Sequence, residues 1–181
     1  AFARSSNVAF SSIIFDNYAK KPSNYISYLK KLDLDKPTDI EILGEPVPFL
    51  NHPASSSWSQ LTLPWLAIGY ENQHTPLQLL TAYNGIINDG IMIRPQIVSS
   101  VTDAGIVIKN NNNQDQTVQV CSKETSDKIK ELTSEVFISG SARNVRSNVV
   151  SMGGKTGTAQ IASSSGYQKA KMYNARFVGH F

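Results

Sequence analysis

The sequence has little of what marks several protein classes. Its single cysteine, Cys121, cannot form a disulfide within the chain. No stretch approaches the ~18 consecutive apolar residues of a membrane-spanning helix. Lysine and arginine are scattered and leave a net charge of only +3, without the concentrated basic stripe of a nucleic-acid-binding protein. We therefore expect no nucleic-acid partner and no membrane span within these residues.

The first residues also lack the features of a translation start. The chain opens on Ala1-Phe2-Ala3-Arg4, with neither an initiator methionine nor a signal peptide. We expect any export signal or anchor to lie outside this chain, so that contact with a membrane would depend on an absent anchor. What is present, 181 residues with 40% hydrophobic and 17% charged side chains, is the composition of one globular domain.

Four stretches have the spacing of amphipathic helices. The clearest begins at Thr75, where a threonine N-cap, Pro76 at the first helical position and Gln78 form a capping box. Asn88-Asp89-Gly90 provides its end. The other three are expected to start at Ser5-Ser6-Asn7, Ser23 and Ser122.

Strand patterns occupy the rest of the second half. Residues 91–101 and 106–108 are expected to pair through a turn at Asp103-Ala104-Gly105. Two further strands are expected over residues 155–161 and 175–181, joined by a polar turn around residues 163–166. Long loops are expected at the proline-rich residues 33–58 and the polar residues 110–116. This order indicates an α+β fold with antiparallel strands, not an alternating βαβ pattern.

Gly154-Lys155-Thr156 first suggests a nucleotide-binding P-loop. That motif requires a glycine five positions before Gly154, where this sequence has Val149. The segment after Thr156 has a strand pattern, whereas a P-loop opens a helix whose N-terminus faces the anion. The P-loop interpretation therefore fails on both points.

Lys155-Thr156-Gly157 acquires meaning from its context. Alone, the tripeptide is compatible with an ordinary polar strand carrying an exposed lysine. An S-x-x-K motif, an S-D-N-type triad and K-T-G together are the signature of penicillin-binding proteins and serine β-lactamases. This sequence has Ser5-Ser6-Asn7 before a helix and K-T-G on a strand, in that chain order.

Several further motifs make the sequence resemble class B penicillin-binding proteins, the cell-division and elongation transpeptidases. Residues 153–160 are similar to the family's extended strand motif, and Gly69-Tyr70 followed by residues 75–79 is similar to its helix signature. Further counterparts are Gly44-Glu45, Gly140-Ser141-Ala142 and Ala175-Arg176-Phe177-Val178-Gly179. The resemblance spans nearly the whole chain.

The resemblance implies the transpeptidase fold of penicillin-binding proteins and serine β-lactamases, an antiparallel sheet flanked by helices. Residues 1–181 would be a partial transpeptidase domain, incomplete at both ends, since the family sheet continues past the last strand. Its open edge would be prone to pairing with another chain. The parent would be a peptidoglycan D,D-transpeptidase at the periplasmic face of the cell membrane, acting on D-Ala-D-Ala stem peptides and inhibited by β-lactam antibiotics. No metal or other cofactor is needed.

The resemblance also implies the roles of individual residues. Ser5 would relay a proton to the leaving amine, and Asn7 would hydrogen-bond the substrate amide and the general-base lysine. Lys155 would supply positive potential to the substrate carboxylate and to Ser5. Three residues would bind substrate: Thr156 through its hydroxyl, Gly157 by letting substrate lie against the strand edge, and Thr158 through an oxyanion-hole N–H.

The nucleophilic serine is expected to lie outside this chain. In the family, S-x-x-K precedes S-x-N, and only four residues precede Ser5. One S-x-x-K match, from Ser27 to Lys30, follows the S-x-N motif on an amphipathic stretch, and we interpret it as a chance match. The isolated chain is therefore expected to be inactive without the missing N-terminal part of the same domain.

Two other functions remain open at this point. One is a β-lactam-sensing or β-lactam-hydrolysing relative with the same fold. The other is a non-catalytic scaffold that keeps the fold for partner binding. The class B-like residues 75–79 and the proline-rich residues 33–58 favour the transpeptidase over the first alternative. Both a division and an elongation role fit the sequence.

Overall fold

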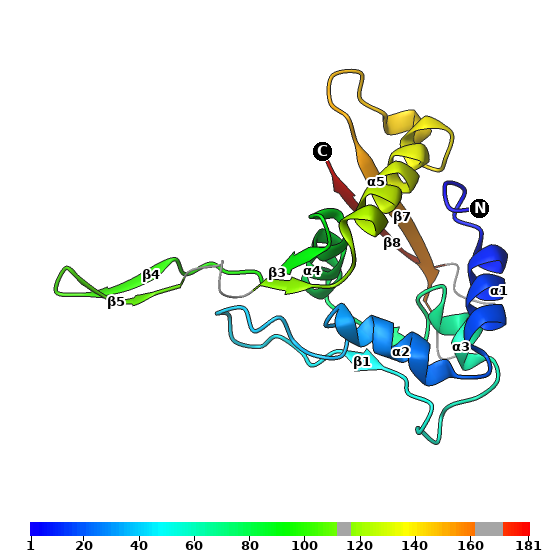
Figure 1. Ribbon diagram of the computed structural model, residues 1–181, viewed down its shortest axis with the longest axis horizontal. Coiled ribbons are helices and arrows are strands. Elements are labelled where there is room, and N and C mark those ends of the chain that lie inside the picture. Colours follow the sequence, from blue (N-terminus) through cyan, green and yellow to red (C-terminus); the bar gives the residue numbers. More distant parts are fainter. Residues whose placement is uncertain (112–116, 162–171) are drawn as a thin grey trace.

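The computed structural model describes residues 1–111, 117–161 and 172–181 (Figure 1). Its helices are α1 (Asn7–Tyr18), α2 (Pro22–Lys31), α3 (Thr62–Leu66), α4 (Pro76–Ile87) and α5 (Lys123–Ile138), with a 3₁₀ turn, η2 (Arg143–Val145). Its strands are β1 (Phe49–Leu50), β2 (Asn72–Gln73), β3 (Ile91–Ile93), β4 (Ser100–Asp103), β5 (Ile106–Asn110), β6 (Thr117–Gln119), β7 (Gly153–Gln160) and β8 (Tyr173–His180). The expected α+β class is confirmed, and the described strands form four separate antiparallel pairs.

The capping box predicted for α4 is confirmed. The Thr75 hydroxyl accepts a hydrogen bond from the backbone N–H of Gln78 at 3.1 Å, and the Gln78 side chain accepts one from the N–H of Thr75 at 2.9 Å. The Gln78 amide also donates to the Glu45 carboxylate at 3.0 Å. The cap therefore starts the helix and ties the proline-rich loop of residues 33–58, whose only strand in the structure is β1, to the body of the domain.

The other three expected helices are present as well. Ser6 is the N-cap of α1 and Ser122 that of α5, each accepting a hydrogen bond from a backbone N–H three residues on. α2 begins at Pro22, one residue before the expected start. Before α1 the chain makes a tight turn, in which the N–H of Ser5 donates to the carbonyl of Phe2 at 2.9 Å.

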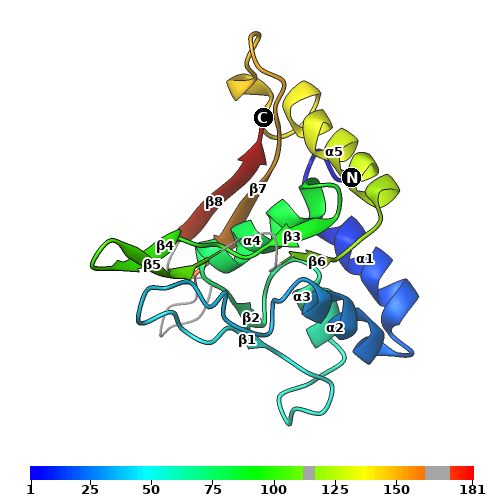
Figure 2. The same cartoon turned by 60° about the vertical axis from the view of Figure 1, so that its left-hand side comes forward.

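The longest pairing in the fold joins β7 and β8. It runs from Gly153 opposite His180 to Gln160 opposite Tyr173. α5 lies against β7, and Figure 2 shows the helix alongside the two strands. The buried cluster beneath this contact consists of Val136, Phe137 and Ala142, with Phe2 and Met152 packed on it. The N-terminal turn is thus anchored to the same core as the strand that carries Lys155.

A side chain of α4 also contacts β8. The Tyr83 hydroxyl of α4 and the His180 ring nitrogen Nδ1 lie 2.7 Å apart. On its outer edge β8 pairs with no strand of the described chain. None of the helices in the described residues is long and apolar enough to cross a lipid bilayer.

The expectation of one strand over residues 91–101 was wrong. β3 ends at Ile93, before Pro95, which has no N–H to donate to a ladder, and β4 begins at Ser100. β3 pairs with β6, a strand that the sequence did not predict.

The predicted hairpin turn is confirmed between β4 and β5. Ala104 and Gly105 have φ values of +47° and +81°, as in a type I′ turn. The hairpin projects away from the rest of the chain (Figure 1). The short elements α3, β1 and β2 were not predicted. The predicted turn at residues 163–166, and residues 112–116 of the predicted loop at 110–116, lie outside the described residues.

Candidate active site

A cleft of about 540 Å³ opens where the N-terminal turn, the end of α3 and the first half of β7 meet. All six residues singled out in the sequence line it. Together with the other lining residues they are Phe2, Ser5, Asn7, Phe10, Ala67, Ile68, Tyr70, Ser141, Lys155, Thr156, Gly157 and Thr158. The fold therefore brings the two motifs, which lie 150 residues apart in the chain, into one site.

Ser5 and Lys155 are in direct contact. The Lys155 ammonium donates a hydrogen bond of 2.6 Å to the Ser5 hydroxyl, and a second one of 2.8 Å to the backbone carbonyl of Thr156. Ser5 has a φ of +52°, a left-handed conformation that is strained for a residue with a side chain and that recurs at functional sites. The tight turn therefore holds the Ser5 hydroxyl in a fixed place beside the lysine.

The electrostatics of the cleft are those of a receptor for an anion. Burial lowers the pKa of Lys155 below its ordinary value. None of the ion pairs in the described parts of the chain involves Lys155, and none of the lining residues is acidic. The centroid of the Phe2 ring lies 6.0 Å from the Lys155 ammonium nitrogen. A partly buried cation without a carboxylate partner favours an anionic group on the ligand.

Thr156 presents its hydroxyl next to Lys155 and is held there by Ser141. The two hydroxyl oxygens lie 2.7 Å apart, and the N–H of Ser141 donates to the carbonyl of Ala3 at 3.0 Å. A Cβ atom on Gly140 would come within 2.3 Å of that same carbonyl, so only glycine permits this close approach. The loop after α5 thereby links the N-terminal turn to β7.

The outer edge of β7 faces the cleft. The N–H of Gln160 donates to the Tyr70 hydroxyl at 3.1 Å, whereas the N–H of Ile161 donates toward the β8 side, to the carbonyl of Met172. Backbone groups alternate in direction along a strand, so the N–H of Thr158 points the same way as that of Gln160, away from β8. A Cβ atom added at Gly157 would meet none of the described atoms within 4 Å, so the space above the strand is open at this residue.

The predicted residues differ in the contacts that they make. Ser5, Lys155 and Thr156 form the hydrogen-bonded centre of the cleft. Asn7 is exposed at the first residue of α1, and its role stays a prediction. Sequence reasoning gave no role to the other six lining residues, which are Phe2, Phe10, Ala67, Ile68, Tyr70 and Ser141. Tyr70 and Ser141 belonged to quoted family motifs, but no local pattern indicated that their hydroxyls would contact β7.

The S-x-x-K match lies elsewhere in the fold. The Ser27 hydroxyl donates to the carbonyl of Ser23 within its own helix at 2.8 Å, and Lys30 forms an ion pair with Asp35 at 3.4 Å. Neither Ser27 nor Lys30 lines the cleft. Among the residues that the structure describes, no group of three or more His, Cys, Asp or Glu side chains is placed to hold a metal ion.

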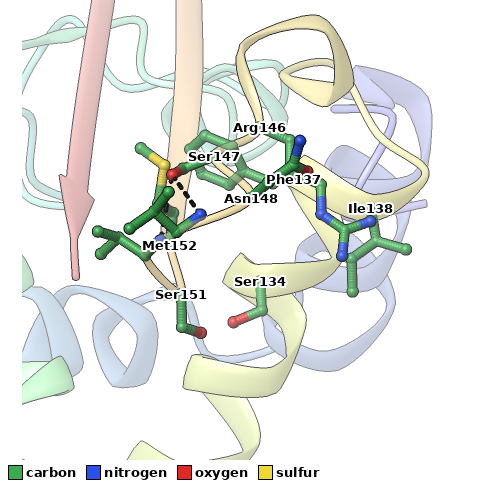
Figure 3. A pocket seen from close by; sticks show the side chains of 10 residues that line it. Ser134, Phe137, Ile138, Arg146, Ser147, Asn148, Ser151 and Met152 are labelled. Carbon is green, nitrogen blue, oxygen red and sulfur yellow. Dashed lines mark hydrogen bonds between the residues drawn. The ribbon is translucent and has the colours of Figure 1, made fainter.

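A second cavity, of about 330 Å³, lies between the end of α5 and the loop that leads into β7 (Figure 3). Arg146 lies beside Ile138 at one wall, and Met152 lines the other. None of the six residues singled out in the sequence lines this cavity. No lysine lines it, so it has no counterpart of the hydrogen-bonded Lys155 and Ser5, and the first cleft is the better candidate for chemistry.

Comparison with known proteins gives a consistent result. The family model described as the penicillin binding protein transpeptidase domain matches residues 1–181. The chain is 27% identical to penicillin-binding protein PbpB of Mycobacterium tuberculosis over 166 residues, which cover 88% of this chain and 24% of that protein. It is 31% identical to penicillin-binding protein H of Bacillus subtilis over 134 residues, 64% of this chain and 18% of that one. The chain thus spans a quarter or less of these relatives.

Solved structures show the same fold. Penicillin-binding protein 3 of M. tuberculosis aligns with a TM-score of 0.81 and 24% identity, covering 98% of this chain and 40% of that one. The transpeptidase domain of Burkholderia pseudomallei penicillin-binding protein 3 aligns with a TM-score of 0.77 and 23% identity, covering 96% and 48%. The M. tuberculosis protein has also been solved in complex with aztreonam and with ampicillin.

Proposed function

The chain belongs to the penicillin-binding protein transpeptidase family, with class B character, and from this premise we propose that the complete protein cross-links peptidoglycan stem peptides by serine acyl transfer. The observation that carries the proposal is the contact between Ser5 and Lys155 beside an open strand edge. A hydroxyl held beside a cation, where it can relay a proton, next to oriented backbone donors for a developing oxyanion is part of the arrangement that acyl transfer requires.

In the proposed reaction, the substrate's terminal carboxylate binds at Lys155 and the Thr156 hydroxyl. Among the described residues the ammonium has no carboxylate partner, and the Ser141 hydroxyl, 2.7 Å from that of Thr156, orients the threonine. This places the D-Ala-D-Ala end of a stem peptide, or the carboxylate of a β-lactam, at the start of β7. The ampicillin and aztreonam complexes of the M. tuberculosis relative support a β-lactam as ligand of the same fold.

The acylation step then uses groups on both sides of the scissile bond. A serine hydroxyl attacks the carbonyl of the penultimate D-alanine, and the N–H of Thr158 stabilises the negative charge that develops on its oxygen. The bond to the terminal D-alanine breaks, and its nitrogen receives a proton relayed through Ser5. Asn7 orients the substrate amide and the general-base lysine. A second stem peptide then attacks the ester with its amine and forms the cross-link.

We further propose that the attacking serine and its lysine lie outside these 181 residues. The only S-x-x-K match in the sequence is Ser27 to Lys30, and both side chains have partners away from the cleft. The chain also corresponds to less than half of the aligned solved relatives. In this proposal the rest of the domain lies outside this chain. The complete protein is periplasmic and is held at the membrane by an anchor that also lies outside this chain.

The proposal is tested on the complete protein with a pentapeptide ending in D-Ala-D-Ala and a labelled D-amino acid as acceptor. We expect release of the terminal D-alanine and incorporation of the label in equal amounts. A protein that takes up a penicillin and hydrolyses it rapidly would instead be a β-lactamase-like relative. A protein that forms an acyl adduct with neither the pentapeptide nor a penicillin would contradict acyl transfer altogether.

A further inference from the structure

The accessible edge of β7 is closed on both sides of Thr158. Residues with an even number on this strand direct both their N–H and their carbonyl away from β8, as the partners of Gln160 and Ile161 establish. The carbonyl of Thr156 already accepts a hydrogen bond of 2.8 Å from the Lys155 ammonium. The N–H of Gln160 already donates one of 3.1 Å to the Tyr70 hydroxyl. Between them, the N–H and the carbonyl of Thr158 have no hydrogen-bond partner in the described parts of the chain, so both can pair with a ligand.

We propose that Tyr70 is a specificity-determining residue that stops strand-like pairing of the acyl donor after Thr158. The inference rests on the proposed function, in which an extended peptide with a terminal carboxylate lies along β7. Such a peptide exchanges two hydrogen bonds with every second residue of its partner strand. After Thr158 the next such residue is Gln160, whose N–H is occupied. The donor pairs with one residue only and then turns away from the strand.

The position of Tyr70 suits it to this role. Its ring packs edge-on against Trp65 with the centroids 4.9 Å apart, and its N–H donates to the Trp65 carbonyl at 3.0 Å. The ring is therefore held by α3, independently of β7, and lines the cleft with its hydroxyl at the strand edge. An amphipathic residue anchored on one element and capping another blocks an edge that would otherwise accept a further strand residue.

The test compares two donors in the complete protein. Both donors end in the same D-Ala-D-Ala carboxylate. The N-terminal residue of the short donor is the one that pairs with Thr158, and the long donor has two more residues at its N-terminus. In the wild type we expect similar kcat/KM values, because the extra residues find no partner on β7. Tyr70→Phe keeps the ring against Trp65 and frees the N–H of Gln160. We expect it to raise the long-to-short ratio about fivefold, the effect of one added hydrogen bond.

A matched control and a second readout keep the outcomes distinct. Tyr28→Phe, on the exposed side of α2, should leave the ratio unchanged. An unchanged ratio in Tyr70→Phe, or an equal slowing of both donors, would overturn the proposal, the latter because Tyr70 would then only hold β7 in place. If neither donor acylates the wild type, the proposed function fails. Hydrogen exchange at the Gln160 amide then tests separately whether Tyr70 caps the edge of β7. Faster exchange in Tyr70→Phe supports the capped edge, and unaltered exchange refutes it.

Discussion

Replacing Lys155 by methionine separates a functional from a structural role of this residue. Methionine keeps much of the side-chain length but removes the charge and both hydrogen bonds of the ammonium, to Ser5 and to the carbonyl of Thr156. The loss of one preorganised electrostatic donor from an acyl-transfer site lowers the rate by about 10²–10³-fold. We therefore expect penicillin acylation of the complete Lys155→Met protein to fall by roughly that factor.

The same substitution should not weaken the fold. Burial lowers the pKa of Lys155, so the charged form is disfavoured in the folded protein relative to the unfolded chain. Between the lowered pKa and the ordinary lysine value, the unfolded state binds more protons and stability rises with pH. Below the lowered pKa the ammonium is destabilising. Lys155→Met should therefore leave the free energy of unfolding at neutral pH unchanged or raise it, and should remove this alkaline dependence.

Stopped-flow acylation and urea unfolding of the same variants measure the two effects. Lys128→Met is the matched control, since Lys128 is exposed on α5 and pairs with Glu124 at 2.7 Å, an interaction worth about 0.3–0.5 kcal/mol. For the wild type we also expect acylation to decline at a pH below the ordinary lysine range. A Lys155→Met protein that loses more than about 2 kcal/mol of stability, or acylates at nearly the wild-type rate, would refute the reasoning.

Three further substitutions give distinct expectations. Ser141→Ala removes the hydroxyl 2.7 Å from that of Thr156 and should slow acylation about five- to tenfold without lowering the unfolding midpoint; an unchanged rate would exclude an orienting role. Thr75→Ala breaks the capping box of α4 and should lower the free energy of unfolding by about 1 kcal/mol in urea titrations, whereas an unaltered midpoint would mean that the cap is dispensable. Phe137→Ala removes a side chain that is 2% exposed and packs against Phe177, and should cost about 3–5 kcal/mol by the same measurement; less than about 1 kcal/mol would contradict the placement of the core.

Local signals in the sequence were sufficient for most helices. The capping box at Thr75, the stop at Asn88 and the serine caps of α1 and α5 depend on residues within a few positions of one another. Such interactions form the same way in any tertiary setting. The hairpin turn at Ala104-Gly105 was predictable for the same reason, because its backbone conformation is set by the turn residues.

Tertiary pairing decided what the sequence could not. The apolar pattern of residues 91–101 continues past Pro95, but the strand divides there because its two parts pair with different partners. β6 has three residues, too few for a periodicity, and exists through its pairing with β3. The contact of Ser5 with Lys155 spans 150 residues, and only the resemblance to a family placed the two in one site. No pattern indicated the bonds of Tyr70 and Ser141 to β7.

The measurement that tests most directly whether this chain is a site without its own nucleophile is an intact mass. The 181-residue chain and the complete protein are each incubated with a reactive penicillin and weighed by mass spectrometry. We expect an unchanged mass for the chain and one penicillin adduct on the complete protein, located on a serine outside residues 1–181. One adduct on the isolated chain would contradict this and would make Ser27 the first residue to replace.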